Sequence, residues 1–320
     1  MASGNFKTTV KFYYYLKMND LSDERKKSVL FIFIDGLGIG QRDENNPFAG
    51  IKNVDPLAHF IGEKGDVIYD GLMIPTDACL GIEGRPQSAS GQTTILTGIN
   101  APKLLGFHKQ GFPNQTLRDV IRDKSIFLQL KNKNVTENVF VNAYTPQFFT
   151  ETPRWKSATT CAVEAAGLQF RKLPDLLGKK ALFHDFTNQT LREKGFNVPV
   201  FSASDAAEIL ADITATHRFT LYEHFTTDKI GHDRDYARAE THLPLLAKFI
   251  SETLKRVDLE KTTVILTSDH GNIEDLSVRT HTLNDVPTII WGKKKKEVSK
   301  RIKDLSDITP AVLKTLEEKT

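Results

Sequence analysis

The sequence predicts an α/β fold in which helices cover both faces of a mostly parallel sheet. The first observation is the continuous apolar run SVLFIFI at residues 28–34, which ends at Asp35-Gly36. A run this short and this rich in β-branched and aromatic residues is typical of a strand buried on both faces. The second observation is that similar runs recur along the chain with helical patterns between them. Strands that alternate with helices indicate parallel β-α-β units.

The expected elements follow from these patterns. Short apolar runs predict strands at residues 28–34, 138–143, 219–225, 262–267 and 287–291. Apolar residues at helical spacing predict helices at residues 117–132, 206–216, 237–257 and 307–317.

Residues 148–199 interrupt the alternation with polar turns and one short helical pattern. We expect them to form a short inserted lid, while residues 28–147 and 200–320 form a metal-binding catalytic core and residues 1–27 an N-terminal tail. The lid carries Arg154 and Lys156, which are candidate substrate contacts. His108, which follows the Ser/Thr-rich segment described below, is a third candidate, and for it a surface loop residue is the alternative.

Composition excludes several classes of function. The formal net charge of +3 comes without a basic stripe interleaved with aromatic residues, so no nucleic-acid partner is expected. No apolar run approaches the roughly 20 residues that span a bilayer, so no membrane partner is expected. The first 17 residues are too interrupted by lysine for a signal peptide. With only Cys79 and Cys161, both read as free thiols, we expect a cytoplasmic protein.

Acidic and imidazole side chains gather where the predicted strands end. Asp35 follows the first strand, Asp228 and His232 follow the third, and Asp269-His270 follow the fourth, while His281 precedes the last. Ligands of open parallel sheets bind beyond the carboxyl ends of the strands. Each residue alone is commonly a helix cap or turn residue. Their joint placement predicts a metal site, and mixed carboxylate and imidazole ligands favour Mn²⁺ or Zn²⁺.

A candidate nucleophile lies in the Ser/Thr-rich segment at residues 86–98. This segment leads into a predicted helix, whose N-terminus offers free backbone N–H groups and positive dipole to a phosphate. A serine beside a metal can ionise and attack phosphorus. An ordinary Ser/Thr helix cap is the alternative, and local sequence does not choose among Ser88, Ser90, Thr93 and Thr94.

Four motifs in the same order resemble the alkaline phosphatase superfamily, in particular the branch of cofactor-independent phosphoglycerate mutase and phosphopentomutase. They are Asp35-Gly36 after the first strand, Ser88 four residues before Gln92, Asp228 with Gly231-His232, and Asp269-His270-Gly271-Asn272 followed by His281 to Pro287. The resemblance covers residues 31–49, 84–105, 225–232, 266–274 and 279–287.

The resemblance implies an alkaline-phosphatase-like core with two divalent ions and Ser88 as the residue that is transiently phosphorylated. It implies one metal on Asp35, Ser88, Asp269 and His270, and the other on Asp228, His232 and His281. The substrate would be a small phosphate ester.

Two departures from the family bear on the reaction. Gln92 stands where the mutases commonly have a histidine, and the insertion is short, whereas the mutases hold their substrate with a large second domain. A mutase must exclude water between its half-reactions. The short lid therefore favours a hydrolytic enzyme, a phosphatase or phosphodiesterase. A phosphomutase is the alternative, followed by a catalytically inactive metal-binding domain, and the oligomeric state stays open.

Overall fold

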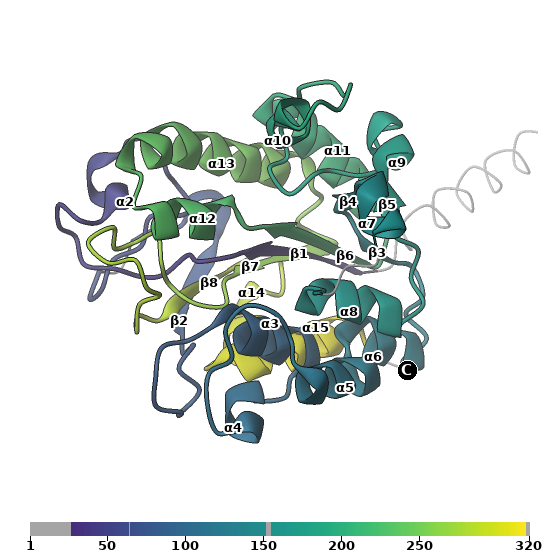
Figure 1. The fold of residues 1–320 in the computed structure, drawn as a ribbon, viewed down its shortest axis with the longest axis horizontal. Coiled ribbons are helices and arrows are strands. Elements are labelled where there is room, and N and C mark those ends of the chain that lie inside the picture. Colours follow the sequence, from purple (N-terminus) through teal and green to yellow (C-terminus); the bar gives the residue numbers. More distant parts are fainter. Residues whose placement is uncertain (1–26, 64, 152–154, 318–320) are drawn as a thin grey trace, which may run out of the picture.

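The computed structural model describes residues 27–63, 65–151 and 155–317. Its centre is a six-stranded sheet in the order β2-β8-β7-β1-β6-β3 (Figure 1). The strands are β1 (Ser28–Ile34), β2 (Leu72–Thr76), β3 (Asn138–Phe140), β6 (Phe219–His224), β7 (Thr262–Thr267) and β8 (Val286–Trp291). The pairs β1–β6, β1–β7 and β3–β6 are parallel, so the predicted α/β fold with a mostly parallel sheet is confirmed.

The central strand explains why the fold has two layers of helices. Along β1, Leu30 and Ile32 join one buried cluster, and Phe31 and Phe33 join the other. Successive side chains of a strand point to opposite faces, so an entirely apolar strand requires cover on both sides.

The helices supply this cover, as Figure 1 shows. One face carries α11 (Ala203–Ala215) and α13 (Tyr236–Arg256), and the other carries α3 (Ser88–Thr97), α5 (Gln115–Lys124), α6 (Ile126–Asn132), α8 (Ala158–Ala165) and α15 (Ile308–Leu316). The remaining helical elements are α2 (Pro47–Gly50), η1 (Ile68–Asp70), α4 (Ala101–Leu105), α7 (Pro146–Thr150), α9 (Leu173–Leu177), α10 (Gln189–Glu193), α12 (Thr226–Asp233), α14 (Lys295–Ser299) and η2 (Leu305–Asp307). Among the described residues, no helix is both long and apolar enough to cross a membrane.

The structure differs from the sequence prediction at the β2 side of the sheet. Strand β8 runs antiparallel to β7, with Leu266 opposite Ile289 and Val264 opposite Trp291. Strand β2 was not predicted, because Pro75 interrupts its short run. Within the described residues it pairs with β8 only, and an edge strand tolerates a proline that a central strand does not.

Two predicted elements are shorter than expected. The strand expected at residues 138–143 ends at Phe140, and residues 143–144 form β4 (Ala143–Tyr144), which pairs with β5 (Arg171–Lys172). The helix expected at residues 117–132 is divided into α5 and α6 at Ser125. The Ser125 hydroxyl accepts the N–H of Leu128 and caps α6, so a new helix begins where the pattern suggested one continuous helix.

Residues 148–199 contain α8, α9, α10, β5 and most of α7. Helix α8 packs against α5 and α6, and α9 packs against β4 and β5. The segment is thus built partly into the helical layer below the sheet. Its role as a separate lid stays a prediction, and the predicted tail at residues 1–27 lies outside the described residues except for Lys27.

The cap at Ser125 gives a test of the division between α5 and α6. Ser125 is fully buried, so Ser125→Ala removes the acceptor for the Leu128 N–H without a replacement from water. We expect the free energy of unfolding to fall by about 1–2 kcal/mol. Urea denaturation measures this, with Ser251→Ala in the middle of α13 as the control. Equal effects of the two substitutions would contradict a capping role.

Candidate metal centre

The predicted metal ligands meet at the edge of the sheet where the parallel strands end. Asp35 follows β1, and its N–H continues the ladder by donating to the His224 carbonyl at the end of β6 (2.8 Å). Asp269 and His270 follow β7, and Asp228 and His232 lie on α12 directly after β6. Because β8 is antiparallel, it begins at this same edge. His281, five residues before β8, therefore reaches the cluster although it precedes its strand.

The first group of side chains consists of Asp228, His232 and His281. The Nε2 atoms of the two imidazoles lie 3.2 Å apart, and the Asp228 carboxylate lies 3.4 Å from His232 Nε2 and 3.6 Å from His281 Nε2. The Nδ1 atoms donate to backbone carbonyls, that of Arg279 at 2.9 Å and that of Pro86 at 2.8 Å. Bonds of this kind fix the tautomer of metal-binding histidines. With Nδ1 of both rings donating, the Nε2 atoms are the ones that face the carboxylate, and each can bind a cation when it carries no proton.

The second group centres on His270 Nε2, which is approached by three oxygen atoms. Ser88 Oγ lies at 3.0 Å, Asp35 Oδ1 at 3.3 Å and Asp269 Oδ2 at 3.4 Å. One ring nitrogen carries at most one hydrogen, so it cannot satisfy three oxygens. In a Ser-His-Asp triad the carboxylate binds the other ring nitrogen, which is not the case here. Convergence of nitrogen and oxygen atoms on one point is instead the arrangement of ligands around a cation.

Unpaired atoms support the same interpretation. Gln92 Nε2 donates to Asp35 Oδ2 (3.2 Å) and to Asp269 Oδ2 (3.1 Å), and so holds the two carboxylates together. The other oxygens of both carboxylates are buried and have no hydrogen-bond partner among the described residues. Buried acceptors without partners are costly. A divalent ion would satisfy them, so the residues fit a metal.

Burial shapes the charges of the second group. Burial, followed by the charges of Asp269 and Asp228, raises the pKa of Asp35 well above its usual value. Burial and the charge of Asp228 raise the pKa of Asp269 to about 8. Burial lowers the pKa of His270 to about 3 and keeps this imidazole neutral. Adjacent buried carboxyls beside a neutral imidazole lack the positive charge that a divalent ion would supply.

The side chains of the first group are less buried than those of the second, and the pKa values of Asp228 and His232 shift in opposite directions. Burial pushes the pKa of Asp228 upward, but the hydrogen bond from His232 and the other neighbours outweigh it and lower the pKa to about 2. The hydrogen bond to Asp228 raises the pKa of His232 to about 9. A bound cation would therefore displace a proton from His232. Asp228 also belongs to a group with Asp35 and His270, so it borders both candidate sites.

A buried polar layer that the sequence analysis did not single out supports these ligands. Asn272 donates to Asp228 Oδ1 (2.7 Å) and to its carbonyl (3.1 Å). Glu274 accepts from the N–H groups of Gly38 (3.1 Å) and Asn272 (2.7 Å), and from Thr282. It thus ties the loop after β1 to the segments that carry His270 and His281. The signal was present, since Glu274 follows the Asp-His-Gly-Asn motif by two residues.

One glycine shows how closely the ligand loops approach. Gly36 has a φ of +74°, and a Cβ there would lie 2.8 Å from the Cα of Asp228. Only glycine combines this conformation with the space available. The Asp-Gly pair after β1 is therefore explained by packing against the helix that carries Asp228.

The predicted substrate contacts are placed differently. Lys156 Nζ pairs with Glu164 Oε1 at 2.7 Å, and His108 Nε2 lies 3.2 Å from the Ile82 carbonyl. Neither is among the described residues that line the cavity beside Ser88. Arg154 lies outside the described residues. Substrate contacts by these three residues stay predictions.

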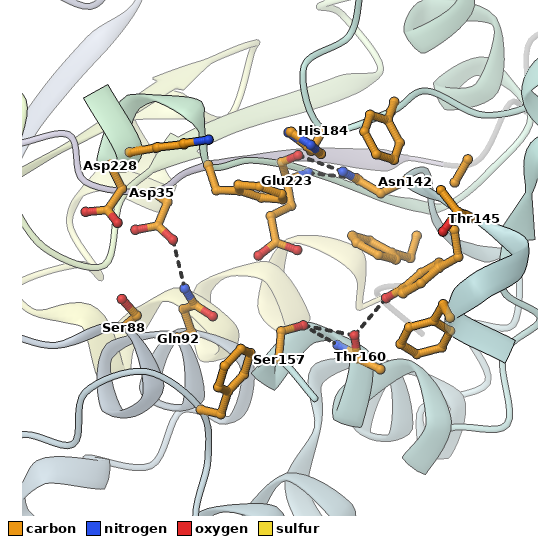
Figure 2. Close-up of a pocket in the computed structure, with 18 of the residues that line it drawn as sticks. Asp35, Ser88, Gln92, Asn142, Thr145, Ser157, Thr160, His184, Glu223 and Asp228 are labelled. Carbon is orange, nitrogen blue, oxygen red and sulfur yellow. Dashed lines mark hydrogen bonds between the residues drawn. The ribbon is translucent and has the colours of Figure 1, made fainter. Parts of the chain in front are cut away.

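Three of the candidate ligands, Asp35, Ser88 and Asp228, line a cavity of about 580 Å³. Figure 2 shows Asp35, Ser88, Gln92 and Asp228 on one side of this cavity, with Glu223, Asn142, Thr145, Ser157 and Thr160 further along it. Several of the latter group lie in or beside residues 148–199, so this segment borders the cavity that the candidate ligands also line.

Comparison with known proteins identifies the family. The family model described as Metalloenzyme superfamily matches residues 26–319. The fold is similar to that of a cold-active alkaline phosphatase from Shewanella sp., with a TM-score of 0.52 at 10% identity over 91% of this chain and 100% of that chain.

Sequence similarity to curated proteins is local. Two 2,3-bisphosphoglycerate-independent phosphoglycerate mutases match, one from Clostridium tetani at 31% identity over 96 residues and one from Methanococcus aeolicus at 24% over 101 residues. These matches cover 27% and 32% of this chain. The chain spans only 18% and 24% of the two relatives.

A neutral isostere tests whether Asp269 serves a metal rather than the fold. Asp269→Asn removes a buried carboxyl, so we expect the chelator-treated variant to melt at or above the wild-type temperature. Mn²⁺ at about 100 times its dissociation constant should stabilise the wild type by about 3 kcal/mol per site, and the variant should lose most of this gain at one site. Differential scanning calorimetry measures both.

Asp212→Asn, an exposed carboxylate on α11, is the matched control and should keep the full gain. A full gain in Asp269→Asn as well would show that Asp269 does not bind the ion.

Proposed function

The chain belongs to the Metalloenzyme superfamily, and on that premise we propose that it is a metal-dependent enzyme that hydrolyses a phosphate ester through a phosphoserine at Ser88. The single observation that carries this proposal is the convergence of Ser88 Oγ, Asp35 Oδ1 and Asp269 Oδ2 on His270 Nε2. This convergence supports Ser88 as the nucleophile, because its hydroxyl oxygen lies beside candidate metal ligands.

Two divalent ions of the Mn²⁺ or Zn²⁺ type suit the two groups. Asp35, Ser88, Asp269 and His270 would hold one ion, and Asp228, His232 and His281 the other, with Asp228 close to both. Such ions favour the ionised form of a serine hydroxyl and neutralise the charge on phosphoryl oxygens.

The backbone around Ser88 suits attack on phosphorus. Ser88 is the first residue of α3, and no side-chain cap of this helix is found in the described part of the chain. Apart from the Ser90 N–H, which donates to the Lys109 carbonyl at 3.2 Å, its first turn therefore offers N–H groups and the positive end of the helix dipole to a phosphoryl group. Ser90 instead donates its hydroxyl to the Gln87 carbonyl (3.2 Å) and accepts the Lys109 N–H (3.0 Å), and so serves the fold.

The covalent steps balance without a further reactant. Ser88 Oγ loses its proton and forms a bond to phosphorus, while the ester oxygen leaves and takes up a proton as the free alcohol. Water then attacks phosphorus, the Oγ–phosphorus bond breaks, and inorganic phosphate and the Ser88 hydroxyl are restored.

Solvent access favours hydrolysis over transfer to a second hydroxyl. The His232 side chain is 44% exposed, so water reaches the first ligand group from one side. A phosphomutase must keep water away from its phosphoserine. The mutase alternative is supported by the local similarity to phosphoglycerate mutases. A catalytically inactive metal-binding domain is the remaining alternative, and metal content together with turnover of an aryl phosphate would separate it from both.

Substitution of the nucleophile gives the most specific test. Ser88→Ala removes the attacking oxygen, so we expect kcat to fall on the order of 10³-fold or more, which corresponds to about 4 kcal/mol of barrier. Metal binding should fall less, because Asp35, Asp269 and His270 remain. Wild-type protein that is acid-quenched during turnover and analysed by mass spectrometry should carry phosphate on Ser88.

Ser90→Ala is the matched control, and it should keep turnover within about threefold while lowering stability slightly. Phosphate trapped on Ser90 or Thr93, or normal turnover by Ser88→Ala, would overturn the assignment.

A metal-supplemented screen of phosphorylated metabolites separates hydrolase from mutase. Scoring free phosphate and isomerised product in the same reactions should show phosphate release with at least one ester and no isomer. An isomerised product formed without phosphate release would establish the mutase instead.

A further inference from the structure

The cavity beside Ser88 has an aromatic lining that the phosphoryl chemistry does not use. Aromatic residues make up 9% of the chain, but they provide six of the twenty lining residues. These six are Phe112, Phe140, Tyr144, Phe148, Phe183 and Phe225. A volume of about 580 Å³ is far more than a phosphoryl group requires and lies within the range of small-molecule sites.

Packing holds part of this aromatic wall in place. The Tyr144 ring lies 4.5 Å from that of Phe148 and 4.7 Å from that of Phe170, measured between centroids. The Tyr144 hydroxyl is hydrogen-bonded to the Thr160 hydroxyl at 2.9 Å. Phe148 is half-buried, and Phe112 and Phe225 are 45% and 42% exposed. Ring surface that remains open to a cavity favours a planar ligand group, which stacks on it.

One buried carboxyl group interrupts this wall. Glu223 is 8% exposed, and Figure 2 shows its side chain extending from β6 into the pocket. The Asn142 side chain fixes the backbone at this position, because its Oδ1 accepts the Glu223 N–H (3.0 Å) and its Nδ2 donates to the Glu223 carbonyl (2.7 Å). Burial raises the pKa of Glu223 to about 7. A buried carboxyl on a backbone fixed in this way is suited to hydrogen-bond a polar ligand group.

The charges of the lining argue against a second anionic group on the substrate. Lys194 and Lys229 are the cationic residues of the described lining, and both are exposed. A carboxylate such as that of phosphoglycerate would lie between aromatic rings and Glu223, and would lose hydration without a buried cation to replace it. The chemistry of the cavity thus differs from what an acidic triose requires.

We propose that this cavity selects phosphate esters whose alcohol portion carries a planar ring, with Phe148 and Tyr144 contacting the ring face and Glu223 contacting a hydrogen-bonding group at the ring edge where the ring has one. Such rings occur in nucleoside monophosphates and in aryl phosphates. The inference rests on the function proposed above, because the phosphoryl group is anchored at Ser88 and directs the rest of the ester into the cavity.

Non-hydrolysable probes test the ring preference by binding. The full chain loaded with Mn²⁺ is titrated calorimetrically with phenylphosphonate and with methylphosphonate, which share a head group and differ in the ring. Phenylphosphonate should bind about tenfold more tightly or better, as expected for burial of a phenyl ring. Equal affinities would overturn the inference and leave the proposed function intact. Failure of both probes to bind would overturn the proposed function and the inference with it.

Two neighbouring phenylalanines provide a matched pair of variants. Phe148→Leu should reduce the ratio of the two affinities by about threefold to tenfold, because Phe148 lines the cavity. Phe149→Leu changes the next residue of α7, whose ring packs on that of Phe148 (5.2 Å between centroids) but is not among the described lining residues, and should change the ratio less than Phe148→Leu does. Equal effects of the two substitutions would contradict a ring contact at Phe148.

The role of Glu223 is tested with rings that do and do not form hydrogen bonds. Adenosine 5′-monophosphate should exceed ribose 5-phosphate in kcat/KM by about tenfold or more, and Glu223→Leu should remove about tenfold of this ratio. The affinity for phenylphosphonate should not change, which also shows that the variant is folded. Glu223→Gln should retain part of the nucleotide preference.

The phosphonate and nucleotide experiments together also distinguish aryl phosphates from nucleoside monophosphates as the substrate class. A phenyl preference without a nucleotide preference supports ring selection and assigns the substrate to the aryl esters. If the ratio of kcat/KM for adenosine 5′-monophosphate to that for ribose 5-phosphate is unchanged in both Glu223 variants, the proposed contact between Glu223 and the ring edge is overturned.

Discussion

Burial of several acidic groups at one edge of the sheet is the constraint on which the rest of the structure depends. Asp35 and Asp269 are held against each other by Gln92, and each has a buried oxygen without a hydrogen-bond partner among the described residues. Such an arrangement is unfavourable unless positive charge is added, because burial and like charges both oppose ionisation. The buried carboxyls therefore lower the stability of the fold at this edge, and they preform a site for cations.

Sheet topology delivers the ligands to that edge. The parallel strands β1, β6 and β7 end there, and each places a ligand within a few residues of its last position. The antiparallel strand β8 begins there, which brings His281 and the Thr282 hydroxyl to the same place. Glu274 then links the loops through backbone N–H groups and side chains, so the separate segments hold one geometry.

Much of this arrangement was predictable from the sequence, for identifiable reasons. The strands at residues 28–34 and 262–267 are buried along their whole length, so the apolar run of the first and the mostly β-branched run of the second gave their bounds to the residue. The ligands were predicted because strand ends are local features. The direction of β8 was not predicted, since an apolar run carries no information on the direction of the strand relative to its neighbours. The edge strand β2 was missed because its burial is partial and a proline lies within it.

The cavity was beyond sequence reasoning because its lining comes from distant segments. Phe112, Tyr144, Thr160 and Phe225 meet only in the folded chain, and Glu223 looks like an ordinary strand residue until Asn142 is seen to fix its backbone. The roles assigned to the predicted ligands and to Ser88 stay predictions, which the proximity of their atoms supports.

The central claim is that two groups of side chains at one edge of the sheet bind two divalent ions. An anomalous difference map from crystals grown with Mn²⁺, collected where manganese scatters anomalously, tests this directly. The account predicts one peak among Asp228, His232 and His281, and a second against Asp35, Asp269 and His270. Peaks confined to other parts of the molecule, or no peak at saturating Mn²⁺ and Zn²⁺, would contradict it.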